Sequence, residues 1–95
     1  MEGRHHTMTL CFSGLLLRLV DYQRTIEVDA ATLGEALDQV EGRHPRLRTV
    51  LRDGEGGIRR SHRVFVNGEL VGAADLATPL ADSDSVEFLT AIAGG

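Results

Sequence analysis

Residues 25–40, with the sequence T-I-E-V-D-A-A-T-L-G-E-A-L-D-Q-V, contain the change of period that decides the fold. The apolar residues Ile26 and Val28 first alternate with polar ones, which is typical of a strand with one buried face. From Thr32 onward the apolar residues recur at helical spacing, and Thr32 with Glu35 has the capping-box pattern of a helix start. The segment therefore predicts a strand that leads directly into an amphipathic helix.

The chain around this segment supplies further strands. Gly42 and the His44-Pro45 step predict the end of the helix, and a further short helical turn should follow it. Alternation predicts strands at 8–13, 62–66, 69–71 and 86–89, with loops around 21–22 and 53–57. Asn67-Gly68 is a strong hairpin signal, because both residues tolerate positive φ. This order predicts an α+β fold in which a small mixed sheet packs against one main helix.

We expect one hydrophobic core between this helix and the sheet. Its expected members are the apolar residues on the inward sides of the predicted elements. They are Ile26, Val28, Leu33, Leu37, Val40, Leu47, Val64, Val66, Leu76, Val86 and Phe88.

Composition limits the class of protein. Ninety-five residues with 42% hydrophobic side chains allow one domain with one core. No apolar stretch reaches the roughly 18–20 residues that a membrane helix needs, and the first apolar run lacks the flanks of a signal peptide. A single cysteine excludes an internal disulfide. We therefore expect a monomeric cytoplasmic domain over residues 8–95, preceded at residues 1–7 by a disordered lead-in or a cloning remnant.

Charge is distributed unevenly along the chain. The net charge of −4 argues against a general nucleic-acid binder. All ten basic residues are Arg, and seven of them lie within residues 43–63, whereas no basic residue follows Arg63. Two interpretations stay open, namely solvated surfaces of opposite sign or a docking surface for partners.

Five motifs together resemble one family. They are T-L-G-E at 32–35, the His44-Pro45 step, V-F-V-N-G at 64–68, T-P-L-A-D-S-D-S-V at 78–86 and A-G-G at 93–95. Over residues 8–95 the chain is similar to the sulfur carriers typified by ThiS of thiamin synthesis and by MoaD, the small subunit of molybdopterin synthase. The resemblance implies the β-grasp, or ubiquitin-like, fold. One departure is T-A-I at 90–92, where these carriers often place a proline.

The resemblance also implies a mechanism. The chain would be no enzyme and would have no catalytic residue; its working group would be the C-terminal carboxylate of Gly95. An E1-like adenylating enzyme would consume ATP to activate this carboxylate, and a sulfur donor would displace AMP. The resulting thiocarboxylate would then serve a sulfur-accepting biosynthetic enzyme. The chain would hold no cofactor of its own, and molybdopterin, cysteine, thiamin and specialised products all stay open as destinations of the sulfur.

The last residues suit this role on physical grounds. Gly94 and Gly95 have no Cβ, so a flexible tail of Ala93, Gly94 and Gly95 can thread a narrow slot and deliver a bare carboxylate. A terminal diglycine is a weak signal alone and a strong one directly after the last predicted strand. We expect Ile92 and Phe88 to contact partners, with Ile92 as an apolar anchor.

Two other functions stay open. The first is a ubiquitin-like modifier joined to other proteins through its C-terminal glycine, although the absence of Lys prevents polymers through its own side chains. The second is an interaction domain, or a permanent small subunit of an enzyme complex, in which the C-terminal tail has no role. Cys11, His44 and His62 are interpreted as structural, and the sequence shows no catalytic triad, phosphate loop or metal-ligand spacing.

Overall fold

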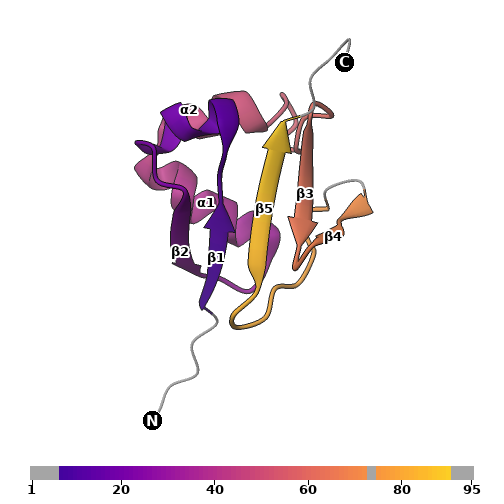
Figure 1. Ribbon diagram of the computed structural model, residues 1–95. Coiled ribbons are helices and arrows are strands. Elements are labelled where there is room, and N and C mark those ends of the chain that lie inside the picture. Colours follow the sequence, from indigo (N-terminus) through magenta and orange to yellow (C-terminus); the bar gives the residue numbers. More distant parts are fainter. Residues whose placement is uncertain (1–6, 73–74, 91–95) are drawn as a thin grey trace.

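The computed structural model describes residues 7–72 and 75–90, which form a five-stranded sheet with helices (Figure 1). The strand order is β2-β1-β5-β3-β4; β1 and β5 are parallel, and all other neighbours are antiparallel. The predicted α+β arrangement with a mixed sheet and one main helix is confirmed. In chain order the elements are β1 (Thr7–Cys11), the 3-10 helix η1 (Gly14–Val20), β2 (Thr25–Asp29), α1 (Leu33–Arg43), α2 (Pro45–Leu51), β3 (His62–Val66), β4 (Glu69–Leu70) and β5 (Ser85–Thr90).

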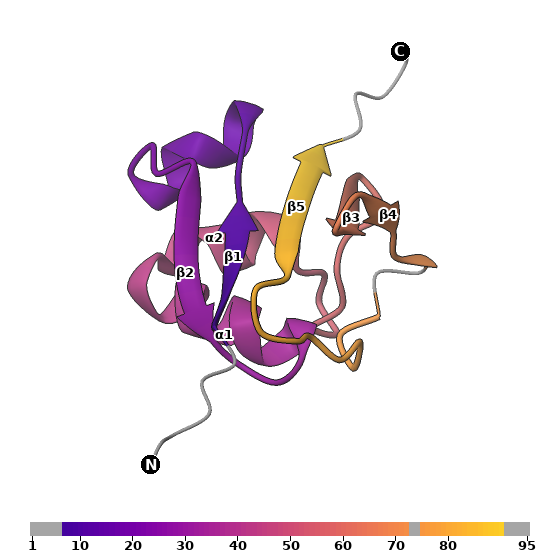
Figure 2. The ribbon, with the colours of Figure 1, turned by 60° about the horizontal axis from the view of Figure 1, so that its bottom comes forward.

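One core lies between the sheet and the helices, and Figures 1 and 2 show α1 and α2 on the same side of the sheet. Every residue that the sequence assigned to this core contributes to it, Val66 and Leu76 being only partly buried. The core also contains apolar residues from β1, from the position directly after it, from η1 and from α2 that the prediction did not include. They are Met8, Leu10, Phe12, Leu16, Val20 and Leu51.

The start of α1 differs from a standard capping box by one residue. The Thr32 hydroxyl accepts a hydrogen bond from the backbone N–H of Glu35 at 3.2 Å, as predicted. The Glu35 carboxylate accepts instead from the backbone N–H of Ala31 at 3.0 Å, one residue before the N-cap. The first turn is therefore closed by two side-chain bonds.

The first turn of α1 is also satisfied by a distant segment. The N–H of Leu33 donates to the Thr78 carbonyl and that of Gly34 to the Leu76 carbonyl, each at 2.9 Å. A Cβ on Gly34 would stand 3.2 Å from the Leu76 oxygen, so this close approach favours glycine. The T-L-G-E and T-P-L motifs, far apart in sequence, thus meet at one place.

The end of α1 corrects one prediction. The helix continues through Gly42 to Arg43, so Gly42 does not terminate it. It ends at His44, whose φ of −133° is extended, and Pro45 is the first residue of α2. Of the two expected stop signals only the proline acts, because it disfavours helical geometry in the residue before it.

Helix η1 was missed by the sequence analysis. Its seven residues are too few for a periodic signal, and the consecutive leucines 15–17 match neither helical nor strand spacing. Leu16 and Val20, four residues apart, point into the core, whereas Leu15 is 69% exposed. The helix ends at Asp21, and both Asp21 and the following Tyr22 have positive φ.

The predicted hairpin after β3 is confirmed. Asn67 and Gly68 have φ values of 53° and 85°, and β4 pairs with β3 through Phe65 and Val66. The Asn67 amide also accepts from the N–H of Ser85 at 2.9 Å and so joins the hairpin to the start of β5. β4 is one residue shorter than predicted.

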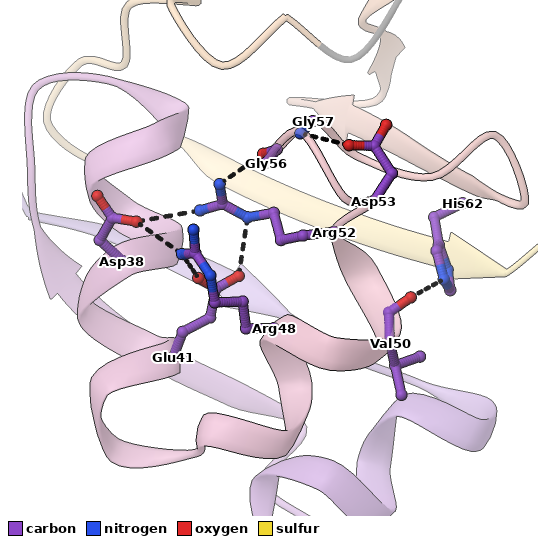
Figure 3. A network of polar contacts seen from close by, with 9 residues as sticks. All are labelled: Asp38, Glu41, Arg48, Val50, Arg52, Asp53, Gly56, Gly57 and His62. Carbon is purple, nitrogen blue, oxygen red and sulfur yellow. Dashed lines mark hydrogen bonds and ion pairs between the residues drawn. The ribbon is translucent and has the colours of Figure 1, made fainter.

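An ion-pair network centred on the buried Arg52 and Glu41 joins α1, α2 and the following loop (Figure 3). Arg52 donates to Glu41 at 2.9 Å, to Asp38 at 3.1 Å and to the Gly56 carbonyl at 2.8 Å. Arg48 donates to the other Glu41 oxygen at 3.1 Å. Of the seven arginines within residues 43–63, Arg52 is therefore buried in ion pairs and does not belong to a solvated surface.

Candidate functional site

The candidate site is the point where the chain leaves the sheet. β5 is the middle strand of the sheet, held by β1 on one side and β3 on the other, and it ends at Thr90. The predicted site residues Ile92, Ala93, Gly94 and Gly95 lie outside the described residues. The structure therefore places the root of the predicted tail and the surface around it.

His62 ties this root to the helices. It pairs with Thr90 across β3 and β5, and the Thr90 hydroxyl lies 3.3 Å from His62 Nδ1. Its Nε2 lies 3.2 Å from the Val50 carbonyl at the end of α2, so Nε2–H donates there (Figure 3). Burial lowers the pKa of His62; the Val50 bond raises it, and the Arg59 charge lowers it. The ring is therefore neutral at pH 7 and acts as a structural link, as predicted.

Phe88 requires a correction. It was expected both in the core and at a partner interface, and the structure confirms the core position only. The side chain is 0% exposed and stacks on Phe12 with ring centroids 5.2 Å apart. Alternation along β5 turns Glu87 and Leu89 outward instead, so the Phe88 side chain is not available to a partner.

The open face of the sheet carries an apolar group near this root. It consists of Phe65, Leu70 and Leu89, which we call the sheet-face patch. Leu70 is 57% exposed and Leu89 is 38% exposed. Phe65 pairs with Leu70 across β3 and β4, and Arg63 pairs with Leu89 across β3 and β5. These outward positions were missed, although they follow from the same alternation that identified the core.

Three further features matter in the described part of the chain: the single cysteine, any group of metal-ligating side chains and any membrane-spanning helix. Cys11 is half-buried on β1, with its sulfur 3.7 Å from the Ser85 hydroxyl. Within 7–72 and 75–90, no group of three or more acidic, histidine or cysteine side chains could hold a metal ion. No helix in these ranges is long and apolar enough to cross a membrane.

Comparison with known sequences gives a consistent assignment. A sequence model described as the ThiS family matches residues 16–95. The sulfur carrier protein CysO of Mycobacterium tuberculosis (strain ATCC 25618 / H37Rv) is 34% identical over 76 residues, covering 77% of this chain and 82% of that protein. Small archaeal modifier protein 1 of Haloferax volcanii is 35% identical over 75 residues, covering 76% of this chain and 83% of that protein.

Solved structures agree with the sequence matches. A chain in the crystal structure of the Amycolatopsis orientalis BexX/CysO complex has a TM-score of 0.83 and 30% identity, covering 93% of this chain and 99% of that chain. The crystal structure of the Haloferax volcanii modifier SAMP1 has a TM-score of 0.81 and 28% identity, covering 94% and 99%. The predicted β-grasp fold is thereby confirmed.

Proposed function

Because the chain belongs to the ThiS family of ubiquitin-like sulfur carriers, we propose that its Gly95 carboxylate is the group that carries sulfur. A carboxylate is a poor acyl donor and must first be activated. Its oxygen attacks the α-phosphorus of ATP on an E1-like partner, and pyrophosphate leaves. A sulfur donor then attacks the acyl carbon, AMP leaves, and the product is a C-terminal thiocarboxylate.

The observation that supports this most is the position of the terminal diglycine. The family match extends to Gly95, and the last described strand ends five residues before it at Thr90. Five residues span at most about 17 Å. A tail of this length lets the carboxylate enter a partner's active site while the folded domain stays outside it, and two glycines keep the entering segment narrow.

We infer that the adenylating enzyme and the sulfur-accepting enzyme dock on the sheet-face patch and on the tail. The patch presents exposed apolar side chains next to the root of the tail. Apolar anchors of this kind dominate interface energy, whereas their neighbours mainly exclude water. Ile92 would extend the same apolar surface along the tail.

The enzyme that receives the sulfur defines the pathway. The chain would act as a co-substrate for a biosynthetic enzyme, or as the permanent small subunit of a synthase of the molybdopterin synthase type. Molybdopterin, cysteine, thiamin and specialised sulfur-containing metabolites are the candidate acceptors.

A second function has a specific observation in its favour. The chain is 35% identical to a protein named as a small archaeal modifier, so conjugation through Gly95 is the alternative. Both functions begin with adenylation. Intact-mass analysis of the protein from its native cell separates them, since a carrier gains the mass of one oxygen replaced by sulfur, and a modifier appears in conjugates.

The direct test removes or blocks the tail. Deletion of Gly95 withdraws the carboxylate by up to roughly 3.3–3.6 Å, and Gly94→Leu places a side chain in the threading segment. Purified adenylating enzyme, ATP and sulfide should load wild-type chain with sulfur and leave both variants unloaded, although all three fold alike. Gly54→Leu is the matched control, because nothing lies within 4 Å of the added Cβ and φ there is ordinary. Loading of the truncated chain at the wild-type rate would refute the carrier proposal.

A further inference from the structure

A pocket of about 330 Å³ lies beside β3, on the side away from β5. Its apolar wall includes Val64, Leu70 and Val71, and its rim carries three arginines. We call it the arginine pocket, with Arg59, Arg60 and Arg63 as its rim.

The pocket exists because β4 is short. β4 pairs with β3 only at Phe65 and Val66, and the N–H of Val71, just after β4, donates a hydrogen bond to the Val64 carbonyl. The first residues of β3 are therefore not covered by a paired strand on this side. His62, which pairs with Thr90 at the end of β5, contributes to the pocket lining from β3.

The three rim arginines have no carboxylate partner among the described residues. Arg63 donates to the Arg60 carbonyl at 2.6 Å, and Arg59 donates to the Thr49 carbonyl at 3.4 Å. Arg48 and Arg52, in contrast, are paired with Asp38 and Glu41. In a chain of net charge −4, the rim brings together three arginines that form no ion pair with a described residue.

The chain's own C-terminal carboxylate is within reach of this rim. Thr90 lies opposite His62, and Leu89 lies opposite Arg63. Neighbouring strands are about 4.8 Å apart, so only β3 separates the end of β5 from the pocket. The five residues from Thr90 to Gly95 span at most about 17 Å, which is enough to cross β3.

We propose that the arginine pocket is a resting site for the chain's own Gly95 carboxylate between encounters with partner enzymes. A short tether gives the carboxylate an effective local concentration in the millimolar range, so the docked state is populated when the three arginines together bind it with an intrinsic Kd of about 1 mM or below. Three arginines around one carboxylate can donate several charge-assisted hydrogen bonds, and ion pairing on this exposed rim is screened by salt. A partner can therefore withdraw the tail without a large barrier.

This inference deepens the proposed function, since it concerns the same carboxylate, but its test does not require sulfur transfer. We expect the {1H}-15N NOE of the Gly94 and Gly95 amides to show restricted motion in the full wild-type chain at low salt. In the triple variant R59Q/R60Q/R63Q these values should fall to those of a free tail. The control R18Q/R24Q/R46Q removes the same charge from three exposed arginines elsewhere and should keep the wild-type values.

A second variant leaves every pocket residue intact. Semisynthesis of the chain with a C-terminal amide at Gly95 removes only the carboxylate charge, and it should release the tail as fully as the triple variant. About 1 M salt, with a Debye length of about 3 Å, should do the same. Amide spectra of β3 and β5 report whether each variant is folded.

Two results would overturn the proposal. One is a tail that is equally mobile in wild type, triple variant and amide. The other is a triple variant with an unchanged tail but weakened binding to the adenylating enzyme, which would assign the pocket to an acidic segment of the partner. A tail that docks as expected but is never loaded with sulfur would refute the carrier function and leave the pocket assignment standing.

Discussion

At the scale of single residues, His62 couples folding to pH. Its folded-state pKa lies below the ordinary 6.5, mainly because burial disfavours the charged ring. Just below pH 6.5 the unfolded chain therefore binds more protons at this residue than the folded one. The free energy of unfolding should rise with pH through that window and level off above it.

Denaturant unfolding at a series of pH values checks this expectation. His62→Gln should flatten the slope below pH 6.5, because it removes the titrating group, whereas His44→Gln should keep it. A slope that survives unchanged in His62→Gln would assign the pH dependence to another residue.

Leu37 tests the core at the same scale. It is 0% exposed on the inward side of α1, so Leu37→Ala loses transfer free energy and leaves a cavity. We expect the free energy of unfolding to fall by about 2–5 kcal/mol. Leu15→Ala makes the same chemical change at a side chain that is 69% exposed, and it should cost less than about 0.5 kcal/mol. Equal losses in chemical denaturation would contradict the assigned core.

At the scale of elements, Arg52 holds α1, α2 and the 53–57 loop together. Its side chain is 6% exposed and that of Glu41 is 4% exposed. Arg52→Ala would leave the Glu41 carboxylate buried with only Arg48 beside it, so we expect a loss of about 3–5 kcal/mol in stability.

Arg48→Ala is the matched control for this network. Arg48 also pairs with Glu41, but its side chain is 55% exposed, and Arg52 still pairs with the buried carboxylate in this variant, so we expect a smaller loss than for Arg52→Ala. Thermal or denaturant unfolding of both variants measures the difference. Similar losses in the two variants would show that burial does not decide the strength of these pairs.

The elements themselves were predictable where one signal was strong. Alternation located β2, β3 and β5, and the change to helical spacing at Thr32 located α1. Gly42 misled the prediction, because a glycine one residue before the end of a helix is tolerated when the proline step supplies the stop. Helix η1 carries no periodic signal of its own and is held by tertiary contacts: Leu16 and Val20 lie in the core, and Leu17 and Leu19 pack against it.

At the scale of the whole molecule, the sheet-face patch should govern association. Leu89→Asp places a charge in this patch, and we expect it to weaken binding to the adenylating enzyme by roughly tenfold or more. Tyr22→Asp is the control, since Tyr22 is 68% exposed in the turn before β2 and its positive φ suits Asp. Calorimetry or surface plasmon resonance measures both. Equal affinity for Leu89→Asp and wild type would move the interface away from this patch.

The sequence by itself determined the local features of this protein. Period, capping and turn residues act between neighbours a few residues apart, so they can be recognised without knowing the fold. The diglycine at 94–95, placed after the last predicted strand, led to the proposal that the Gly95 carboxylate carries sulfur.

The tertiary structure alone decided which apolar side chains gather on the open face of the sheet and which arginines form ion pairs. Alternation along β5 turns Phe88 inward and Leu89 outward, but only the pairing of β3 with β4 and β5 places Leu89 on one face with Phe65 and Leu70. Arg52 and Arg59 belong to the same basic band of sequence, yet one is buried against Glu41 and the other lies at a pocket rim. These outcomes depend on contacts between residues distant in sequence, whose geometry exists only once the chain has packed.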